Sequence, residues 1–309
     1  MWTAAASSPL AIPRPRAAPG WLPGLPAHLT PGVALAIAGA LAVAGIAAWL
    51  LWSWTRARRA LRRLRRAPLP RYPVVLAHGF FGFDEIRIGG ASHGYFRGVR
   101  ERLERDGWTV HSASVAKTAS IAARAAELAE FVRAVPGRRV NVVAHSMGGL
   151  DARYAISELG LGGRVASLTT VGTPHLGTPL ADAGARAPLL AALARVGMEV
   201  DAIHDLTTER MAEFNRAVPD APGVAYGSVV GAARRKRDMN PLLLPTFVWL
   251  AERDGPSDGV VPARSQRWGE VLREIEADHW AQIGWAGSRR FDAAEFYAEL
   301  LRELRGRGF

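Results

Sequence analysis

The sequence predicts an α/β fold with a mostly parallel sheet and helices on both of its faces. From residue 72 onward, short apolar segments rich in β-branched residues alternate with segments of helical spacing, and no internal repeat is visible. Strands that alternate with helices are joined by crossover connections, which pair the strands in parallel. With 309 residues and 49% hydrophobic content, the chain has enough apolar side chains for one large core. We therefore expect one α/β domain with an appendage.

The expected elements follow in a regular order. Strands are predicted at 73–77, 109–114, 140–144 and 165–171, with helices between them at 96–106, 121–135 and 149–159. Segments 225–231, 247–252 and 271–276 are expected to supply the last strands, and 293–305 a closing helix. The apolar stripes of 183–218 predict a helical lid beside an acyl pocket, to which 241–250 is expected to contribute. For 242–250, a buried strand or helix of the core is an equally good interpretation.

The first 71 residues differ from the rest in composition. Residues 1–31 are rich in Pro, Ala and Gly without periodicity, which predicts a disordered tail. Residues 32–54 carry no charge and, at about 1.5 Å per residue in a helix, are long enough to cross a bilayer. Three tryptophans gather at the end of this segment, and the Arg-rich stretch 55–71 follows. The pattern predicts one transmembrane helix, a juxtamembrane linker and a globular domain at 72–309.

The charge of the chain is concentrated in the same region. Residues 1–71 hold ten arginines and no acidic residue, which accounts for most of the formal net charge of +11. Seven arginines follow the apolar segment closely and two precede it, so a single-pass protein with its globular domain in the cytoplasm is favoured over a periplasmic one. A cleaved signal peptide is the alternative, but its positive charges would precede the apolar run. Arginines beside an apolar segment favour anionic lipid over nucleic acid as a partner.

The segment 140–149 predicts a nucleophile elbow, in which a strand turns sharply into a helix around a serine. Such a turn exposes the serine Oγ and leaves almost no room for side chains two positions to either side. Ala144 and Gly148 occupy those positions around Ser146. Because the chain has no cysteine, disulfides and a thiol nucleophile are excluded. Ser146 is the candidate nucleophile.

A serine nucleophile needs a base, and the base needs an anionic partner. His279 is the only histidine after residue 204 and follows the expected strand 271–276, so it is the candidate base. Asp258, in the turn 256–262, is the candidate acid, and Asp254 is its competitor. The backbone N–H groups of Phe80 and Met147 are expected to form the oxyanion hole. His78 and His175 are expected to support the structure rather than take part in the chemistry.

Four segments carry a family resemblance. Residues 72–84, the Thr173-Pro174-His175 segment within 169–182, residues 257–261 and Asp278-His279-Trp280 resemble the bacterial true lipases of the Pseudomonas and Burkholderia type. The elbow at 144–149 is similar to that of the small Bacillus lipases. The resemblance implies an α/β-hydrolase fold and, with the apolar segment, a membrane-anchored serine esterase or lipase acting on carboxylic esters of lipids without a cofactor.

One departure from these lipases concerns calcium. The relatives hold a structural calcium with an aspartate two residues after the catalytic histidine, where this chain has Ala281. Asp238 is available as an upstream ligand, but one carboxylate does not make a site for six to eight oxygen ligands, so we expect no metal.

Several functions stay open at this point. A phospholipase, a thioesterase or an acyltransferase would use the same triad, because the substrate is chosen by the shape of the pocket. From a different class, a non-catalytic scaffold tethered to a membrane is the other alternative. The sequence does not predict the oligomeric state.

Overall fold

The computed structural model describes residues 31–66, 71–80, 85–88, 91–116, 118–188, 195, 200–285 and 291–309, without the side chains of 31–38, 57–66, 85–88 and 91–93. The predicted disordered tail lies outside these residues, apart from its last one, and so does the part of the predicted lid at 189–194 and 196–199. The chain divides into two compact units, residues 1–67 and residues 68–309.

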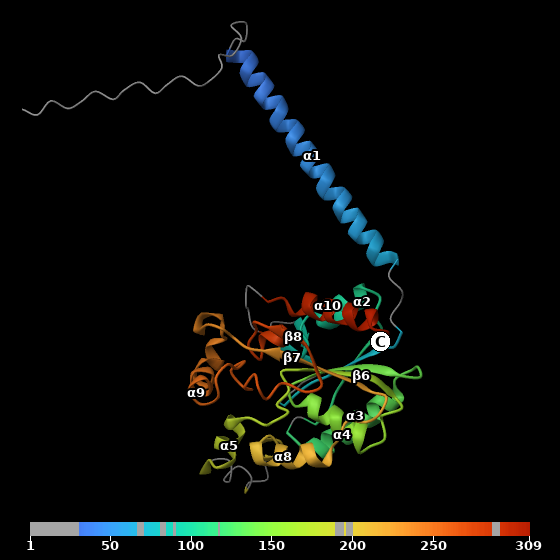
Figure 1. The fold of residues 1–309 in the computed structure, drawn as a ribbon, viewed down its shortest axis with the longest axis vertical. Helices are drawn as coiled ribbons and strands as arrows, with labels where there is room; N and C mark the ends of the chain where they lie inside the picture. Colours follow the sequence, from blue (N-terminus) through green and yellow to red (C-terminus); the bar gives the residue numbers. More distant parts are fainter. Residues whose placement is uncertain are drawn as a thin grey trace, which may run out of the picture. The chain divides into compact units, whose positions relative to one another are not determined.

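The helix of the first unit is α1 (Pro31–Arg66), drawn in blue in Figure 1. It continues beyond Trp54 into the Arg-rich stretch, so residues 55–66 are helical where a linker was expected. Within the described part of the chain, no helix combines the length and the apolarity needed to cross a membrane. The described side chains of α1 begin at residue 39, and polar Ser53, Thr55 and Arg56 follow the apolar run. The transmembrane prediction for 32–54 is therefore not supported.

The second unit is built on a parallel sheet of six strands in the order β4-β1-β5-β6-β7-β8 (Figure 1). Val75 of β1 lies opposite Val142 of β5 on one side and His111 of β4 on the other. The strands are β1 (Val74–Ala77), β4 (Val110–Ala113), β5 (Val140–His145), β6 (Val165–Val171), β7 (Ala225–Gly231) and β8 (Glu270–Ile275). The order places β1, β5 and β6 in the middle, where the loops at their carboxyl ends meet.

Helices cover both faces of this sheet (Figure 1). Val74 and Leu76 of β1 pack into one apolar cluster with α2 (Val99–Arg105) and α10 (Ala293–Gly306). Val75 and Ala77 point the other way, into a second cluster with α3 (Ile121–Ala134) and α4 (Gly148–Ser157). Because successive side chains of a strand point to opposite faces, a continuous apolar strand requires cover on both sides. The predicted parallel α/β architecture is confirmed.

The remaining elements include two departures from prediction. Segment 247–252 was expected as a strand but lies in a helix, because Leu243, Phe247 and Leu250 are spaced for one helical face and are buried. An unpredicted two-stranded antiparallel sheet lies between β1 and α2. The strands of this small sheet are β2 (Glu85–Ile88) and β3 (Ala91–Gly94). The other remaining α-helices are α5 (Pro179–Ala185), α7 (Asp201–Asp205), α8 (Thr208–Ala217) and α9 (Leu244–Asp254). Three short 3-10 helices are η1 (Lys236–Asp238), η2 (Pro241–Leu243) and η3 (Ala281–Ile283).

Candidate active site

Ser146 lies at the sharp turn between β5 and α4. Among the described residues it is the one non-glycine residue with a positive φ, of 55°, a region that L-residues adopt at a cost in strain. Its N–H donates to the Val171 carbonyl at 2.9 Å, and its carbonyl accepts the Thr173 hydroxyl at 2.7 Å. A Cβ at Gly148 would lie 2.5 Å from the carbonyl oxygen of His78, so glycine is required where these two loops meet. The turn therefore has the geometry of a nucleophile elbow.

Three predicted site residues from distant parts of the sequence meet at this turn. His279 Nε2 lies 3.0 Å from Ser146 Oγ, and His279 Nδ1 lies 2.7 Å from Asp258 Oδ2. The serine is 7% exposed, the histidine 6% and the aspartate fully buried. A carboxylate at Nδ1 holds the imidazole proton on that nitrogen, which leaves Nε2 as the acceptor for the serine hydroxyl. The arrangement suits general-base activation of Ser146, and the catalytic roles of the three residues stay a prediction.

The structure also separates the two candidate acids. Asp258 Oδ1 accepts the backbone N–H groups of Val260 and Val261 at 2.9 and 2.7 Å, while Oδ2 receives His279 and the Gln282 amide. Four donors thus use the acceptor positions of the carboxylate. Asp254, the competitor, pairs with Arg264. Asp258 is the candidate acid that contacts His279, and its orienting role stays a prediction.

The two predicted oxyanion-hole residues flank the serine. Met147 caps α4, so its N–H belongs to the first turn, whose N–H groups have no partner within the helix. Phe80 ends the described part of the loop after β1 and packs in the same apolar cluster as Met147. Their role as two backbone donors for a negatively charged oxygen stays a prediction.

A buried ion pair supports the loop that carries Phe80. The Arg124 guanidinium of α3 donates to the His78 carbonyl at 2.9 Å and lies 2.7 Å from Asp151 of α4. Both side chains of the pair are fully buried. A buried cation keeps its charge only when hydrogen-bond acceptors surround it, so Arg124 fixes the two elements and the loop relative to one another.

The two other histidines of the motifs have structural partners. His78 Nδ1 lies 2.9 Å from the Gly79 carbonyl, and its Nε2 accepts the Val115 N–H at 3.2 Å. His175 is fully buried, and its Nε2 lies 3.0 Å from the Thr170 hydroxyl. Burial, followed by the charge of a nearby arginine, holds the pKa of His175 well below its usual value, so the ring is neutral.

The loop after His279 is closed by hydrogen bonds from Asp278, next to the position where calcium was considered. Asp278 Oδ1 accepts the N–H groups of Trp280 and Ala281, and its Oδ2 accepts the Asn240 N–H. Asp238 faces Arg235 at 3.9 Å. Asp278 thus accepts hydrogen bonds from three backbone groups, and the expectation of no calcium stays a prediction. In the described part of the chain, no three acidic, histidine or cysteine side chains are grouped to hold a metal.

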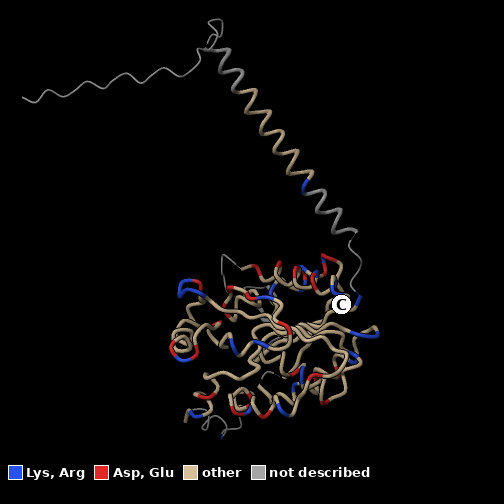
Figure 2. The backbone as a smooth tube through the Cα atoms, in the orientation of Figure 1, with Lys and Arg blue, Asp and Glu red and all other residues tan. Residues whose placement is uncertain are grey.

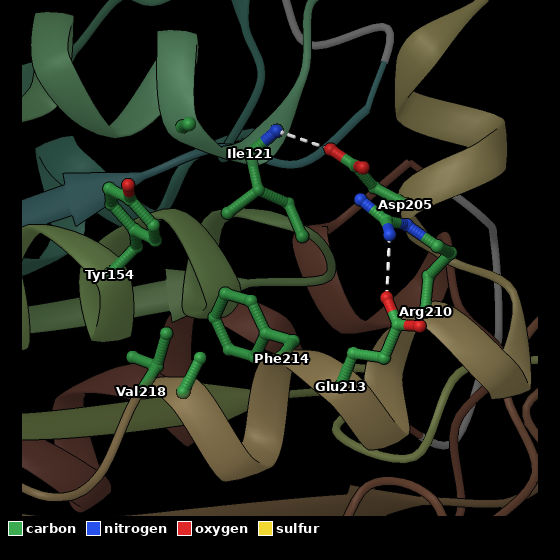
Figure 3. Close-up of a pocket in the computed structure, with 9 residues that line it drawn as sticks. Ile121, Tyr154, Asp205, Arg210, Glu213, Phe214 and Val218 are labelled. Atoms are coloured by element: carbon green, nitrogen blue, oxygen red, sulfur yellow. Dashed lines mark hydrogen bonds and ion pairs between the residues drawn. The ribbon is translucent and has the colours of Figure 1, made fainter.

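A mainly apolar cavity of about 300 Å³ lies between α3, α4 and α8 (Figure 3). Tyr154, Phe214 and Ile121 line it, and all three belong to the apolar cluster that contains Met147. Two polar contacts lie among its lining residues: the Ile121 N–H donates to Asp205, and Arg210 pairs with Glu213. No residue of the triad lines this cavity. The predicted lid and acyl pocket at 183–218 therefore stay a prediction.

Charged residues of both signs are interspersed along the second unit (Figure 2). Many of them are paired, as in the contacts of Arg102 with Glu295 and of Arg273 with Glu303.

Comparisons with known proteins agree with this geometry. A family model described as alpha/beta hydrolase fold matches residues 72–196. A triacylglycerol lipase of Vibrio cholerae is 30% identical over 247 residues, which cover 66% of this chain and 76% of that protein. The chain belongs to the α/β-hydrolase family. Triacylglycerol lipase 2 of Saccharomyces cerevisiae is 29% identical, with 74% of this chain and 85% of that protein covered.

Solved structures of other α/β-hydrolases share the fold. The metagenomic carboxyl esterase MGS0156 matches with a TM-score of 0.68 and 20% identity, and the match covers 78% of this chain and 77% of the esterase chain. The mature Bacillus licheniformis lipase BlEst2 matches with a TM-score of 0.60 and 22% identity, and this match covers 76% of this chain and 95% of the lipase chain. Together with the lipases of Pseudomonas fragi and Burkholderia plantarii among the sequence relatives, these matches confirm the predicted resemblance to bacterial lipases. This α/β-hydrolase is an enzyme of the lipase and esterase group.

Sequence reasoning missed three side chains of the site. Arg124, Tyr95 and Gln282 lie in segments without a recognised motif, yet they contact the oxyanion loop, His145 and Asp258 respectively. The one available signal was Arg124, a charged residue on the apolar face of the predicted helix 121–135.

Proposed function

We propose that this α/β-hydrolase hydrolyses carboxylic esters of lipids through Ser146, His279 and Asp258. The observation that carries the proposal is the continuous chain of contacts from Ser146 Oγ through His279 to Asp258 Oδ2, at 3.0 and 2.7 Å, on a strained turn. The lipase names of its sequence relatives support the class of substrate.

In the proposed mechanism, Ser146 Oγ attacks the ester carbonyl carbon while His279 Nε2 takes the hydroxyl proton. The carbonyl oxygen becomes an oxyanion, which the N–H groups of Phe80 and Met147 stabilise at the N-terminus of α4. Collapse of this intermediate releases the alcohol, which receives the proton from His279, and leaves an acyl group on the serine. Water then attacks the acyl-enzyme with His279 again as the base, releasing the carboxylic acid. Asp258 stays ionised and holds the imidazole throughout.

We propose in addition that α1 attaches the enzyme to a lipid surface. Its described side chains include large apolar residues that are between 52% and 68% exposed. These residues are Leu41, Val43, Ile46, Trp49, Leu50, Leu51, Trp52 and Trp54. Exposed apolar surface on this scale marks an interaction site, and tryptophan and arginine favour the lipid interface.

The ester reaction is tested on p-nitrophenyl esters from acetate to palmitate, with and without detergent micelles. We expect hydrolysis by the wild type, a preference for longer acyl chains when micelles are present, and no hydrolysis by Ser146→Ala at an unchanged melting temperature. Wild-type turnover in Ser146→Ala would refute the proposed triad. A rate confined to acetate would refute the lipid substrate.

Attachment to lipid is tested by flotation with anionic lipid vesicles. We expect the full chain to float with the vesicles, and a variant with Trp49, Leu50 and Trp52 replaced by serine to stay at the bottom. The matched control is Leu242→Ser, because Leu242 is 74% exposed but lies in the second unit. Equal flotation of the triple variant and the wild type would show that α1 is not the attachment.

A further inference from the structure

Gln282 is a buried side chain beside the triad that the proposed mechanism does not use. It lies in η3, three residues after His279, and is fully buried. Its Nε2 donates to Asp258 Oδ2 at 3.0 Å, the same oxygen that lies 2.7 Å from His279 Nδ1. Burying an amide costs free energy that only hydrogen bonds offset. The interaction that this amide makes is with the carboxylate of the triad.

Two glycines leave the space that the Gln282 amide occupies. A Cβ at Gly172, which follows β6, would lie 2.2 Å from Gln282 Oε1. A Cβ at Gly231, the last residue of β7, would lie 2.1 Å from Gln282 Nε2. A side chain at either position would displace the amide from Asp258. The ends of two neighbouring strands thus form a fitted cradle for this one group.

His145 and Tyr95 form a second set of contacts behind His279. The rings of His145 and His279 have centroids 4.5 Å apart, and His145 Nδ1 lies 2.8 Å from the Tyr95 hydroxyl. The Tyr95 hydroxyl also has a backbone hydrogen bond from Gly79 that lowers its pKa, although burial raises that pKa more. A hydrogen bond that lowers the pKa of a tyrosine is one donated to its oxygen, which leaves the hydroxyl proton for Nδ1. His145 then carries its own proton on Nε2.

The Gln282 side chain also acts on His145. Burial, followed by the charge of neighbouring His279, holds the pKa of His145 well below its usual value, while the Gln282 side chain and the His279 backbone raise that pKa. Within the described residues, His145 Nε2 and Gln282 Oε1 are both buried and have no hydrogen-bond partner. His145 is therefore a neutral ring behind His279.

We propose that Gln282 is a positioning residue of this enzyme, which holds the Asp258 carboxylate toward His279. The inference rests on the proposed triad and deepens it. Asp258 must keep its orientation while positive charge develops on the imidazole, and a carboxylate held by donors at both oxygens does not reorient during that step. Gln282 supplies the side-chain donor that shares Oδ2 with His279.

Two substitutions of Gln282 test this role in the full-length protein. Gln282→Leu removes the donor, and we expect kcat to fall roughly ten- to a hundredfold with KM nearly unchanged. Gln282→Glu keeps the size and shape of the side chain and replaces the amide with a carboxyl group. At the acid end of the profile, the glutamate and Asp258 share one proton, so the glutamate still donates to the aspartate. As the pH rises the glutamate ionises and repels Asp258, so kcat/KM relative to the wild type should fall by about tenfold across the profile.

Gln266→Leu is the matched control. Gln266 is also fully buried. Its hydrogen-bond partners are backbone groups of Gly231 and Val261, whereas Gln282 donates to the Asp258 side chain. We expect this change to lower the melting temperature and to leave the shape of the pH profile unaltered. For each variant, the measured quantity is its kcat/KM divided by that of the wild type at the same pH. A positioning role is supported when this ratio is independent of pH for Gln282→Leu and declines as the pH rises for Gln282→Glu.

Two results would overturn the inference. One is a wild-type kcat in Gln282→Leu, and the other is a Gln282→Glu ratio that does not change with pH. If Gln282→Leu does not fold, the profile of Gln282→Glu decides alone. Ser146→Ala separates this inference from the proposed function: activity in Ser146→Ala refutes the triad itself, whereas an inactive Ser146→Ala with a fully active Gln282→Leu refutes only the positioning role.

Discussion

Replacing Asp258 with asparagine changes one atom of the site and reverses one hydrogen bond. Two backbone N–H groups donate to Asp258 Oδ1, at 2.9 and 2.7 Å, and they would hold the amide oxygen of the asparagine at that position. The new NH₂ group would then face His279 Nδ1 and Gln282 Nε2, where Oδ2 now accepts at 2.7 and 3.0 Å. Facing a donor, His279 must adopt the tautomer with its proton on Nε2. In that tautomer it cannot take the proton of Ser146.

A base held in the wrong tautomer costs roughly 10⁴-fold in kcat, or about 5.5 kcal/mol of transition-state stabilisation. We expect a loss of this size in Asp258→Asn, measured on p-nitrophenyl butyrate, with KM nearly unchanged. Asp254→Asn is the matched control, because Asp254 pairs with the half-exposed Arg264 and should stay within about twofold of the wild type. A near-normal rate in Asp258→Asn would refute this reasoning. A large loss in Asp254→Asn would move the acid to that residue.

Three further outcomes follow from the site. Arg124→Leu should lower the free energy of unfolding in urea by about 3–5 kcal/mol, because it leaves Asp151 buried without its cation; a change below about 1 kcal/mol would contradict this. Buried, neutral His145 and His175 have pKa values below the ordinary 6.5. The unfolded chain therefore takes up more protons below pH 6.5, and the free energy of unfolding should fall with the pH by up to about 1.4 kcal/mol per pH unit for each histidine. A constant free energy of unfolding from pH 7 to 5 would contradict this. EDTA should change neither activity nor melting temperature, and a loss that calcium restores would show that the 278–281 loop binds metal.

The fold and the triad are accessible from sequence because their signals are local or unique. The β-branched run 140–144 leads directly into the Ser146 turn, and His279 has no competitor after residue 204. The strand expected at 247–252 failed for a physical reason. A short apolar run fits the helical or the strand period, and only the packed partners of Phe247 select the helix.

The supporting contacts of the site are not accessible in this way. Gln282 approaches Asp258 across 24 positions of sequence, and Arg124 reaches Asp151 across 27. A glutamine in a short segment has the same pattern whether it is solvated or buried, and the place of Arg124 on an apolar helix face indicates burial without naming its partner. The space for Gln282 depends on Gly172 and Gly231, whose roles appear only when the strands are side by side. Tertiary packing, which a single sequence does not encode locally, determines these positions.

The most direct test of the central claim is to find which residue reacts with a fluorophosphonate. The reagent phosphonylates a serine activated by a neighbouring base and does not react with an ordinary hydroxyl. The account predicts one adduct per chain by intact mass, on the peptide that contains Ser146, and none in Ser146→Ala or His279→Ala at an unchanged melting temperature. An adduct on another residue, or labelling that persists in Ser146→Ala, would contradict the assignment of Ser146 as the nucleophile.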